Sequence, residues 1–317
     1  MKQIHPAQFP ILAVHPGALG DLILFGEFLS ALRRRHGRAR LIAGAEKGAL
    51  LAGLGVVEEA LDFESLPMAE VFADTPVSEC SLPKRLGGCD LLVSCLAAGD
   101  EAAQQRLAAL CSAGRAVFLP IRPPEDFDGH LVDLWAGLAG VESVPLPDWR
   151  VPEAWRAEAR AALAEAGAAA DGPYVLIHPG SGSREKCWPL DRFVELARSC
   201  APAPVFVLGP TELDWWGAAT AASLRAEFPT LVAPPLAVLA ALAAGASACV
   251  GNDSGPTHLA AAVGTPTVAI FGTGARAHFA PRGPRVQILA DADVASIAPD
   301  AVLAALGGAG PLAAAGG

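Results

Sequence analysis

The chain contains 317 residues with a mass of 32.3 kDa, a length that favours two domains of roughly 150 residues over a single core. Hydrophobic residues make up 52% of the sequence and charged residues only 18%, which excludes a disordered chain because ample apolar surface is available to offset the entropy lost on folding. The formal net charge of −10 has the wrong sign for general nucleic-acid binding, so no nucleic-acid partner is expected.

The first half alternates short apolar runs with longer, helically periodic segments, a pattern typical of parallel α/β layers. Residues 1–10 lack the pattern of a secretory signal, so we expect a cytoplasmic protein. A helix is predicted over about residues 21–35, directly after the first strand. The strands predicted in this half are Ile11–His15, Arg40–Ala43, Leu91–Cys95 and Ala116–Leu119.

A proline-rich segment, Val144–Pro152, separates the two halves and predicts a linker between domains of residues 1–148 and 149–317. The strands predicted in the second half are Tyr174–His178, Val205–Leu208, Ala248–Val250, Thr267–Phe271 and Val286–Leu289. The sequence therefore predicts two doubly wound, Rossmann-like α/β domains, with ligands held in a cleft between the carboxyl ends of their sheets.

One stretch, residues 231–252, is uncharged and nominally long enough to cross a bilayer. Pro234, Pro235 and Gly245 interrupt it, so we predict a turn, a buried helix over 236–244 and a strand over 248–250 instead of a membrane span. The cysteines number seven, form no Cys-x-x-Cys pair and lie at no metal-ligand spacing, which predicts reduced, mostly buried thiols and no metal site.

The first candidate site, residues 15–21, follows a strand and opens a helix. Gly17 and Gly20 would permit a tight turn and close approach of another molecule, and Asp21 stands at the helix start, facing the cleft. An equally good interpretation is that Asp21 only complements the helix dipole, which would stabilise the helix by about 0.3–1 kcal/mol. A dinucleotide site is less consistent with the sequence, because the three-glycine fingerprint is missing.

The second candidate site is the loop of residues 178–189. Its glycines, hydroxyls and cations suit a diphosphate, with backbone N–H groups and serines donating hydrogen bonds while Lys186 supplies charge. The alternative is a flexible surface connection, in which Trp188 and Pro189 anchor the start of the next helix.

The third candidate site, residues 251–260, lies between a buried strand and an Ala-rich helix. Asp253 or Ser254 could cap that helix, and Pro256 fits its first turn. The same helix end carries a partial positive charge that attracts phosphate, and His258, one turn further in, is a candidate binding residue.

Two further features stand outside these segments. Glu212 follows another strand, where a carboxylate can accept both ribose hydroxyls, although an exposed first-turn glutamate is the commoner explanation. A basic run ends the first helix, where cations are favourable in any case but could also meet an anionic acceptor or a membrane surface. Its residues are Arg33, Arg34, Arg35, His36, Arg38 and Arg40.

Three of these motifs, in this order and spacing, resemble glycosyltransferase family nine, the ADP-heptose:lipopolysaccharide heptosyltransferases. They are Gly-Ala-Leu-Gly-Asp at 17–21, His-Pro-Gly at 178–180 followed by Lys-Cys-Trp-Pro at 186–189, and Asn-Asp-Ser-Gly-Pro-Thr-His-Leu-Ala at 252–260. The resemblance covers about residues 11–283. It implies a GT-B fold in which the N-terminal domain holds the acceptor and the C-terminal domain holds the nucleotide sugar.

The resemblance also implies an inverting transfer in which Asp21 is the general base. The acceptor-side loop would contain His15, Gly17, Ala18 and Gly20. The implied donor-binding residues are Ser181, Ser183 and Lys186 for the diphosphate, Glu212 for the ribose, and Asp253, Ser254, Gly255 and His258 for the sugar and phosphates. No cofactor or metal is strictly required by this scheme, and the sequence has no Asp-x-Asp loop to hold one. The expected partners are an ADP-sugar donor and an anionic glycolipid acceptor, with no obligate protein partner.

The sequence departs from the family pattern at two places. His15 stands where members commonly have arginine, and the segment from Thr273 to Pro281 is altered. These departures keep two alternatives open: a nucleotide-sugar-binding module without turnover, and the same fold with another donor sugar or acceptor. A lipid-linked acceptor would require peripheral contact at the inner face of the membrane.

Overall fold

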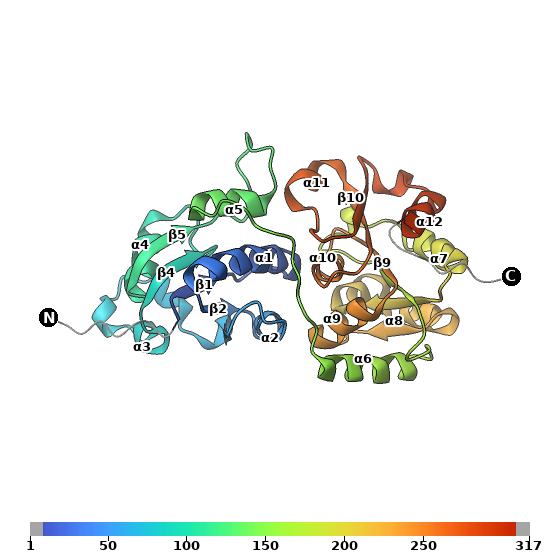
Figure 1. Cartoon of the computed structure of the whole chain (residues 1–317), viewed down its shortest axis with the longest axis horizontal. Coiled ribbons are helices and arrows are strands. Elements are labelled where there is room, and N and C mark those ends of the chain that lie inside the picture. The colour runs from blue at the N-terminus through green and yellow to red at the C-terminus, as the bar shows by residue number, and fades with distance from the viewer. Residues whose placement is uncertain (1–8, 309–317) are drawn as a thin grey trace. The chain divides into compact units, whose positions relative to one another are not determined.

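The computed structural model describes residues 9–308, and the predictions for residues 1–8 and 309–317 lie outside this part. The chain divides into two compact units, Met1–Pro145 and Leu146–Gly317 (Figure 1). The boundary falls inside the predicted linker, and no helix or strand lies between Ala139 and Glu153 in the described chain. Val144, Trp149 and Val151 are nevertheless buried, so the linker is packed against the protein at these positions.

The first unit is built on a five-stranded, fully parallel sheet in the order β3-β2-β1-β4-β5. Its strands are β1 (Ile11–Val14), β2 (Ala39–Ala43), β3 (Glu59–Asp62), β4 (Cys89–Ser94) and β5 (Ala113–Phe118). Its α-helices are α1 (Leu19–His36), α2 (Ala45–Gly53), α3 (Leu82–Leu86), α4 (Glu101–Leu110) and α5 (Leu131–Ala139). Short 3-10 turns span Phe63–Ser65, Met68–Phe72 and Val77–Glu79.

The second unit is built on a six-stranded parallel sheet in the order β11-β10-β9-β6-β7-β8. Its strands are β6 (Val175–His178), β7 (Pro204–Leu208), β8 (Thr230–Val232), β9 (Ala248–Asn252), β10 (Thr267–Gly272) and β11 (Val286–Asp291). Its α-helices are α6 (Glu153–Glu165), α7 (Leu190–Ser199), α8 (Pro210–Glu227), α9 (Leu236–Gly245), α10 (Gly255–Ala262), α11 (Thr273–Phe279) and α12 (Pro299–Gly308). Two 3-10 turns, η4 (Arg184–Lys186) and η5 (Val294–Ser296), complete it.

The predicted doubly wound α/β architecture is confirmed in both units, and each predicted strand is present with its ends shifted by at most a few residues. Strands β3 and β8 were not predicted. Both are edge strands, of four and three residues. Edge strands are often short, and such segments carry too few residues to show a period.

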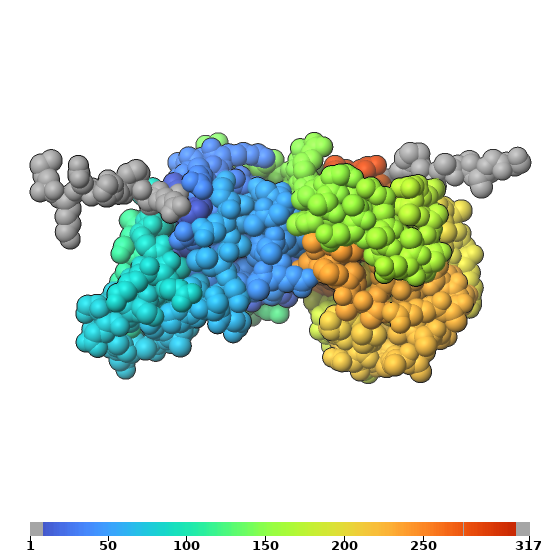
Figure 2. All heavy atoms as spheres, turned by 90° about the horizontal axis from the view of Figure 1, so that it is seen from below, coloured from blue at the N-terminus to red at the C-terminus, as the bar shows by residue number. Residues whose placement is uncertain are grey.

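The stretch that resembles a membrane span forms the end of β8, then α9 and β9; the helix and the second strand were predicted, whereas β8 was not. Helix α9 is buried along most of its length, with α6 packed over it on the outer surface of the unit (Figure 2), which explains its nearly uniform apolar sequence. Within residues 9–308, no helix combines the length and apolar character needed to cross a bilayer.

The seven cysteines are all free thiols, five of them buried, as the sequence predicts. The basic run serves largely to tie the first unit together. Arg33 donates hydrogen bonds to the Gly55 and Val56 carbonyls and pairs with Glu58. Arg35 donates to the Gly140 carbonyl over 2.6 Å, and Arg40 donates to Glu59 and to the Leu86 carbonyl. These bonds favour the structural interpretation of the run over an anionic binding face.

Candidate donor-binding site

The second and third candidate segments meet at the point in the second sheet where the strand order reverses. Strands β6 and β9 are neighbours, although 69 residues separate their ends, His178 and Ala248. In open parallel sheets, the loops that leave such a pair at their carboxyl ends diverge to opposite faces and leave a crevice for a ligand. The loops after β6 and β9 are the two predicted phosphate segments, so the fold places both at this position.

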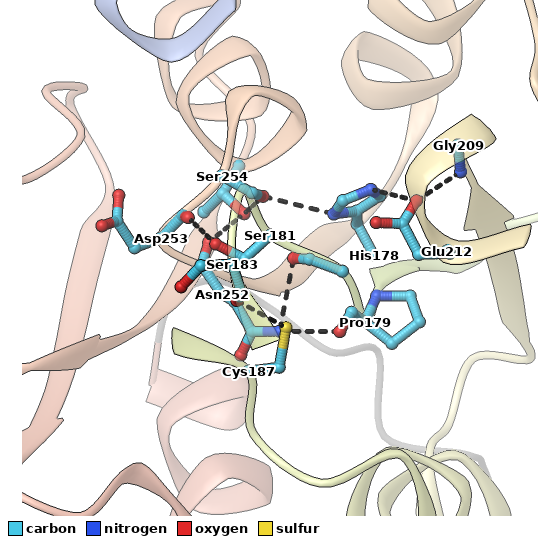
Figure 3. A network of polar contacts seen from close by, with 12 residues as sticks. His178, Pro179, Ser181, Ser183, Cys187, Gly209, Glu212, Asn252, Asp253 and Ser254 are labelled. Atoms are coloured by element: carbon cyan, nitrogen blue, oxygen red, sulfur yellow. Dashed lines mark hydrogen bonds and ion pairs between the residues drawn. The ribbon is translucent and has the colours of Figure 1, made fainter. Parts of the chain in front are cut away.

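Asn252, at the end of β9, connects the two loops. Its side-chain amide donates a 2.7 Å hydrogen bond to the Pro179 carbonyl (Figure 3). Its side-chain oxygen accepts from the Trp188 N–H over 2.9 Å. Trp188 is fully buried, stacks edge-on against Phe193 and donates from its indole N–H to the Ile297 carbonyl. The loop is therefore held at both ends, and Trp188 and Pro189 anchor the start of α7, as the alternative interpretation expected.

Asp253 gathers two of the predicted diphosphate ligands around itself. Its carbonyl accepts a 2.6 Å hydrogen bond from the Ser181 hydroxyl, and its carboxylate lies 2.8 Å from the Lys186 ammonium. Burial alone would raise the pKa of Asp253, but the neighbouring His258 and Lys186 outweigh it and lower that pKa. The carboxylate is thus charged and fixes Lys186, whose side chain is half-exposed and able to meet an anion.

Ser254 occupies the N-cap position of α10, but its side chain makes no capping hydrogen bond, so the predicted capping role is wrong. The hydroxyl instead contacts His178 Nδ1 at 3.2 Å and Thr257 Oγ1 at 3.0 Å. It is drawn inward because these two buried polar atoms lie beneath the helix end. The N-terminal amides of α10, which begins at Gly255, are consequently not covered by this side chain, which favours anion binding there.

Glu212 is only 3% exposed, so its interpretation as an exposed first-turn glutamate is wrong. Its Oε2 accepts a 2.6 Å hydrogen bond from the Gly209 N–H and lies 3.6 Å from His178 Nε2. Burial raises the pKa of Glu212, but His178 and the Gly209 N–H together hold it below its usual value. This carboxylate comes from the first turn of α8, so a third segment joins the site.

The remaining predicted donor residues lie close by. His258 is buried, with Nε2 3.9 Å from Asp253 and with Nδ1 lacking a hydrogen-bond partner among the described residues. Ser183 is half-buried, and its carbonyl accepts a hydrogen bond from the Cys187 thiol. Burial and the nearby Glu212 raise the pKa of Cys187 to about 11, so this thiol stays neutral.

The loop predicted to face the acceptor lies in the first unit and is organised around a buried His15. That imidazole is 1% exposed, packs against Phe25 and accepts a hydrogen bond from the Gly17 N–H through Nδ1. Burial, together with the charge of Lys47, lowers the pKa of His15 to about 4. His15 is therefore neutral and turned inward, and its side chain shapes the loop instead of offering a contact to an acceptor.

Asp21 lies in the first turn of α1 and is half-buried. Gly20 was expected to lie in the turn before the helix. It is instead the second residue of α1, which has Ala18 at its N-cap. Lys47 donates a 2.5 Å hydrogen bond to the Gly17 carbonyl and so braces the loop from α2.

Comparison with known proteins identifies the family. A sequence profile described as glycosyltransferase family 9 (heptosyltransferase) matches residues 127–297, more than half of the chain. The chain belongs to glycosyltransferase family 9. No curated protein sequence matches it.

Solved structures agree with this membership at the level of the fold. The E. coli ADP-heptose LPS heptosyltransferase II is 18% identical with a TM-score of 0.74, over 95% of this chain and 98% of its own. A glycosyl transferase family 9 protein from Veillonella parvula is 19% identical with a TM-score of 0.74, and the match covers 96% of this chain and 97% of that protein. The E. coli heptosyltransferase WaaC with ADP is 17% identical with a TM-score of 0.66, and the match covers 94% of this chain and 99% of that protein. The predicted GT-B fold is confirmed.

Three residues of this family 9 site were missed by the sequence analysis: His178, Asn252 and Thr257. Each lies inside a motif that was recognised, and all are buried. For His178 and Asn252 the signal was available, because polar residues at the carboxyl end of an apolar strand are costly unless they are hydrogen-bonded. Thr257 lies in α10 and carried no such signal.

Proposed function

We propose that this family 9 glycosyltransferase moves a heptose or related sugar from an ADP-sugar to a lipopolysaccharide core or a related cell-envelope glycan, with inversion at the anomeric carbon. The observation that carries the proposal is the convergence of Lys186, Asp253 and Glu212, from two loops and the first turn of α8, at the carboxyl edge of one sheet. One cation, one helix N-terminus and one buried carboxylate are what a diphosphate and a ribose together require.

The donor is assigned to the second unit. Lys186, Ser181, Ser183 and the amides that open α10 at Gly255 would bind the diphosphate, and Glu212 would accept the ribose hydroxyls. Asp253, Ser254 and His258 lie where the sugar and its phosphate would be held. The relatives with these folds include proteins whose names state ADP-heptose or ADP, which supports an ADP-sugar as the donor.

In the proposed reaction, Asp21 takes the proton of an acceptor hydroxyl as that oxygen attacks the anomeric carbon. The new carbon–oxygen bond forms on one face while the bond to the diphosphate breaks on the other, and ADP leaves with the electron pair. Lys186 and the α10 amides stabilise the charge that develops on the leaving diphosphate. Protein groups alone perform these steps, so we expect no metal or cofactor requirement.

The acceptor is proposed to be an anionic glycolipid, as the name of the E. coli relative suggests. We further propose that the protein acts in the cytoplasm, in peripheral contact with the inner membrane face, because the proposed acceptor is lipid-linked.

The test is Asp21→Asn, assayed for donor turnover and for ADP binding. A positioned general base contributes about 10²–10⁴-fold, so turnover should fall by that factor while ADP affinity is unchanged. Asp90→Asn, which changes an exposed carboxylate of the same unit, is the matched control and should retain full activity. Equal turnover in Asp21→Asn and the control would remove Asp21 from the mechanism.

A further inference from the structure

The proposed acceptor loop of the first unit, residues 15–18, has no cation of its own. His15 is buried and neutral, and the other three residues are a proline, a glycine and an alanine. Asp21, in the first turn of α1, adds a negative charge at the same edge of the sheet. An anionic acceptor would be repelled here unless a cation from another segment offsets this charge.

The sheet places one such cation beside the loop. In the described part of the first unit, only Lys47 and Arg122 lie within four residues after the end of a strand. The basic run lies at the far end of α1, where Arg33, twelve residues beyond Asp21, is about 18 Å further along the helix axis. The remaining cations lie in α3, α4 and β5 and are Lys84, Arg85, Arg106 and Arg115. Arg122 follows β5, whereas Lys47 follows β2, which pairs directly with β1, the strand that leads into the loop.

The Lys47 side chain is fixed against this loop. Its ammonium donates a 2.5 Å hydrogen bond to the Gly17 carbonyl from α2, a helix that packs against α1. Gly44 leaves room for the aliphatic stem, because a Cβ at Gly44 would lie 3.1 Å from Lys47 Cε. The side chain is half-buried, and the bond to Gly17 uses one of the three ammonium protons. The other two can be donated to an oxyanion.

Lys47 and Asp21 act on different sides of the loop. Burial and the charge of Lys47 together lower the pKa of His15 to about 4, which shows that the ammonium lies close to the inner side of the loop. Burial and the charge of Asp21 raise the pKa of Cys95, which directly follows β4, the other neighbour of β1. The cation therefore reaches the loop from the β2 side, and the proposed base acts on the β4 side.

We infer that Lys47 recognises an anionic group, a phosphate or a carboxylate, on the acceptor. The assignment rests on the proposed function, to which it adds a specificity-determining residue on the acceptor side. The anionic group pairs with the Lys47 ammonium on one side of the loop, while the reacting hydroxyl of the same acceptor lies at Asp21 on the other. The ammonium also offsets the charge of Asp21, so an anionic acceptor can approach the base.

The binding test uses phosphatidylcholine vesicles that carry lipopolysaccharide truncated to its first core sugars, with the full-length protein and no donor. We expect the wild type to bind, and Lys47→Gln to bind about tenfold more weakly because a charge-assisted hydrogen bond is lost. Lys47→Arg keeps the charge and should retain most of the affinity. The control Lys84→Gln, at an exposed position in α3, should bind as the wild type does. Equal binding by the wild type and Lys47→Gln, or no binding by the wild type, would overturn the inference.

Two modified lipopolysaccharides identify the anionic group, one with its phosphates removed and one with its carboxylates converted to amides. The difference between the wild type and Lys47→Gln should disappear with the preparation that lacks the recognised group. A difference that persists with both would contradict recognition of either group. Vesicles that carry phosphatidylglycerol instead of lipopolysaccharide test for a general attraction to anionic membranes. Weaker binding of Lys47→Gln to these vesicles as well would contradict recognition of the acceptor.

Transfer kinetics separate recognition from simple bracing of the loop. Lys47→Gln should raise the KM for the acceptor about tenfold while kcat and ADP affinity change little, because a binding contact alone is lost. If Lys47 only braced the loop, Asp21 would shift and kcat would fall with every acceptor preparation, which would overturn the inference. Absence of transfer by the wild type would contradict the proposed function, while the vesicle measurements would still decide the role of Lys47.

Discussion

At the scale of single residues, the site depends on glycines at tightly packed positions as much as on charged side chains. Gly180 lies directly against Glu212, and a Cβ built on Gly180 would approach Glu212 Oε1 to 1.7 Å. Gly251 is similarly confined, because its Cβ would lie 2.5 Å from Thr257 Oγ1. These glycines allow the loop after β6 and the strand β9 to pack closely against the buried side chains of Glu212 and Thr257.

Gly180→Ala should therefore displace the Glu212 carboxylate and weaken both the fold and ADP binding. We expect a loss of about 1–3 kcal/mol in unfolding free energy, as for other overpacked buried positions. Gly182→Ala is the matched control, two residues along the same loop, because its Cβ would meet nothing within 4 Å. Thermal denaturation and ADP calorimetry of the pair check this, and equal behaviour of the two variants would refute it.

The identity of the charged residues could be predicted from sequence, but their partners could not. Lys186 and Asp253 stood in motifs whose spacing suggested phosphate binding, and the structure brings them within 2.8 Å. The inward turn of Ser254 and the burial of Glu212 depend on His178, which lies 76 and 34 residues away in the chain. Such pairings follow from the strand order, which local pattern does not encode.

At the scale of elements, helix α8 is divided by Gly217, whose φ of 74° and ψ of 169° interrupt the helical conformation. The break lies just after Trp215, whose carbonyl accepts a 2.9 Å hydrogen bond from Arg184, with the guanidinium 5.6 Å from the indole ring centroid. Arg184 belongs to η4 with Lys186, and Glu212 belongs to the first part of α8. The break therefore helps to connect the diphosphate loop with the ribose carboxylate.

Gly217→Ala places a side chain in a backbone conformation that is nearly restricted to glycine, and should destabilise the protein by about 1–3 kcal/mol. Gly137→Ala, at an exposed position inside the regular helix α5 with open space around its Cβ, should instead stabilise by about 0.5–1 kcal/mol. Denaturant unfolding of both variants measures the difference. The same sign for both would show that the break in α8 is not a requirement of the fold.

Among the helices and strands, some could be predicted from the sequence and others could not. Buried strands such as β9 and helix α9 were predictable because their apolar runs have the length and punctuation of those structures. The edge strand β3, Glu59–Asp62, is half-buried throughout and carries acidic residues at both ends, so nothing in its pattern separates it from a loop. Its strand character comes from pairing with β2.

At the scale of the whole molecule, each unit completes its own parallel sheet and its own core. One core gathers around Trp188, Phe193 and Phe206 in the second unit, and another around Leu92, Leu107 and Leu110 in the first. The proline-rich boundary was visible in the sequence because prolines forbid a continuous helix there. Ligand binding to one such unit should stabilise that unit first.

Hydrogen exchange with ADP present should therefore slow within the second unit, in peptides covering residues 178–189, 208–216 and 251–260. Ligand at about 100 times its dissociation constant stabilises the bound form by about 2.7 kcal/mol, which exchange readily detects. Peptides covering β2 and β3, residues 39–62, serve as the internal control and should be unchanged. Protection confined to the first unit would reverse the assignment of the donor.

The measurement that tests the donor site most directly is calorimetry of ADP, ADP-heptose, UDP and NAD with the wild type, Lys186→Ala and the control Arg192→Ala, an arginine on the exposed face of α7. The account predicts selective binding of ADP and ADP-heptose by the wild type. In Lys186→Ala, the affinity for both should fall about tenfold or more, because Asp253 then loses its cation. In Arg192→Ala, the affinity should be unchanged. Failure of the wild type to bind ADP, or equal affinity in Lys186→Ala, would contradict it.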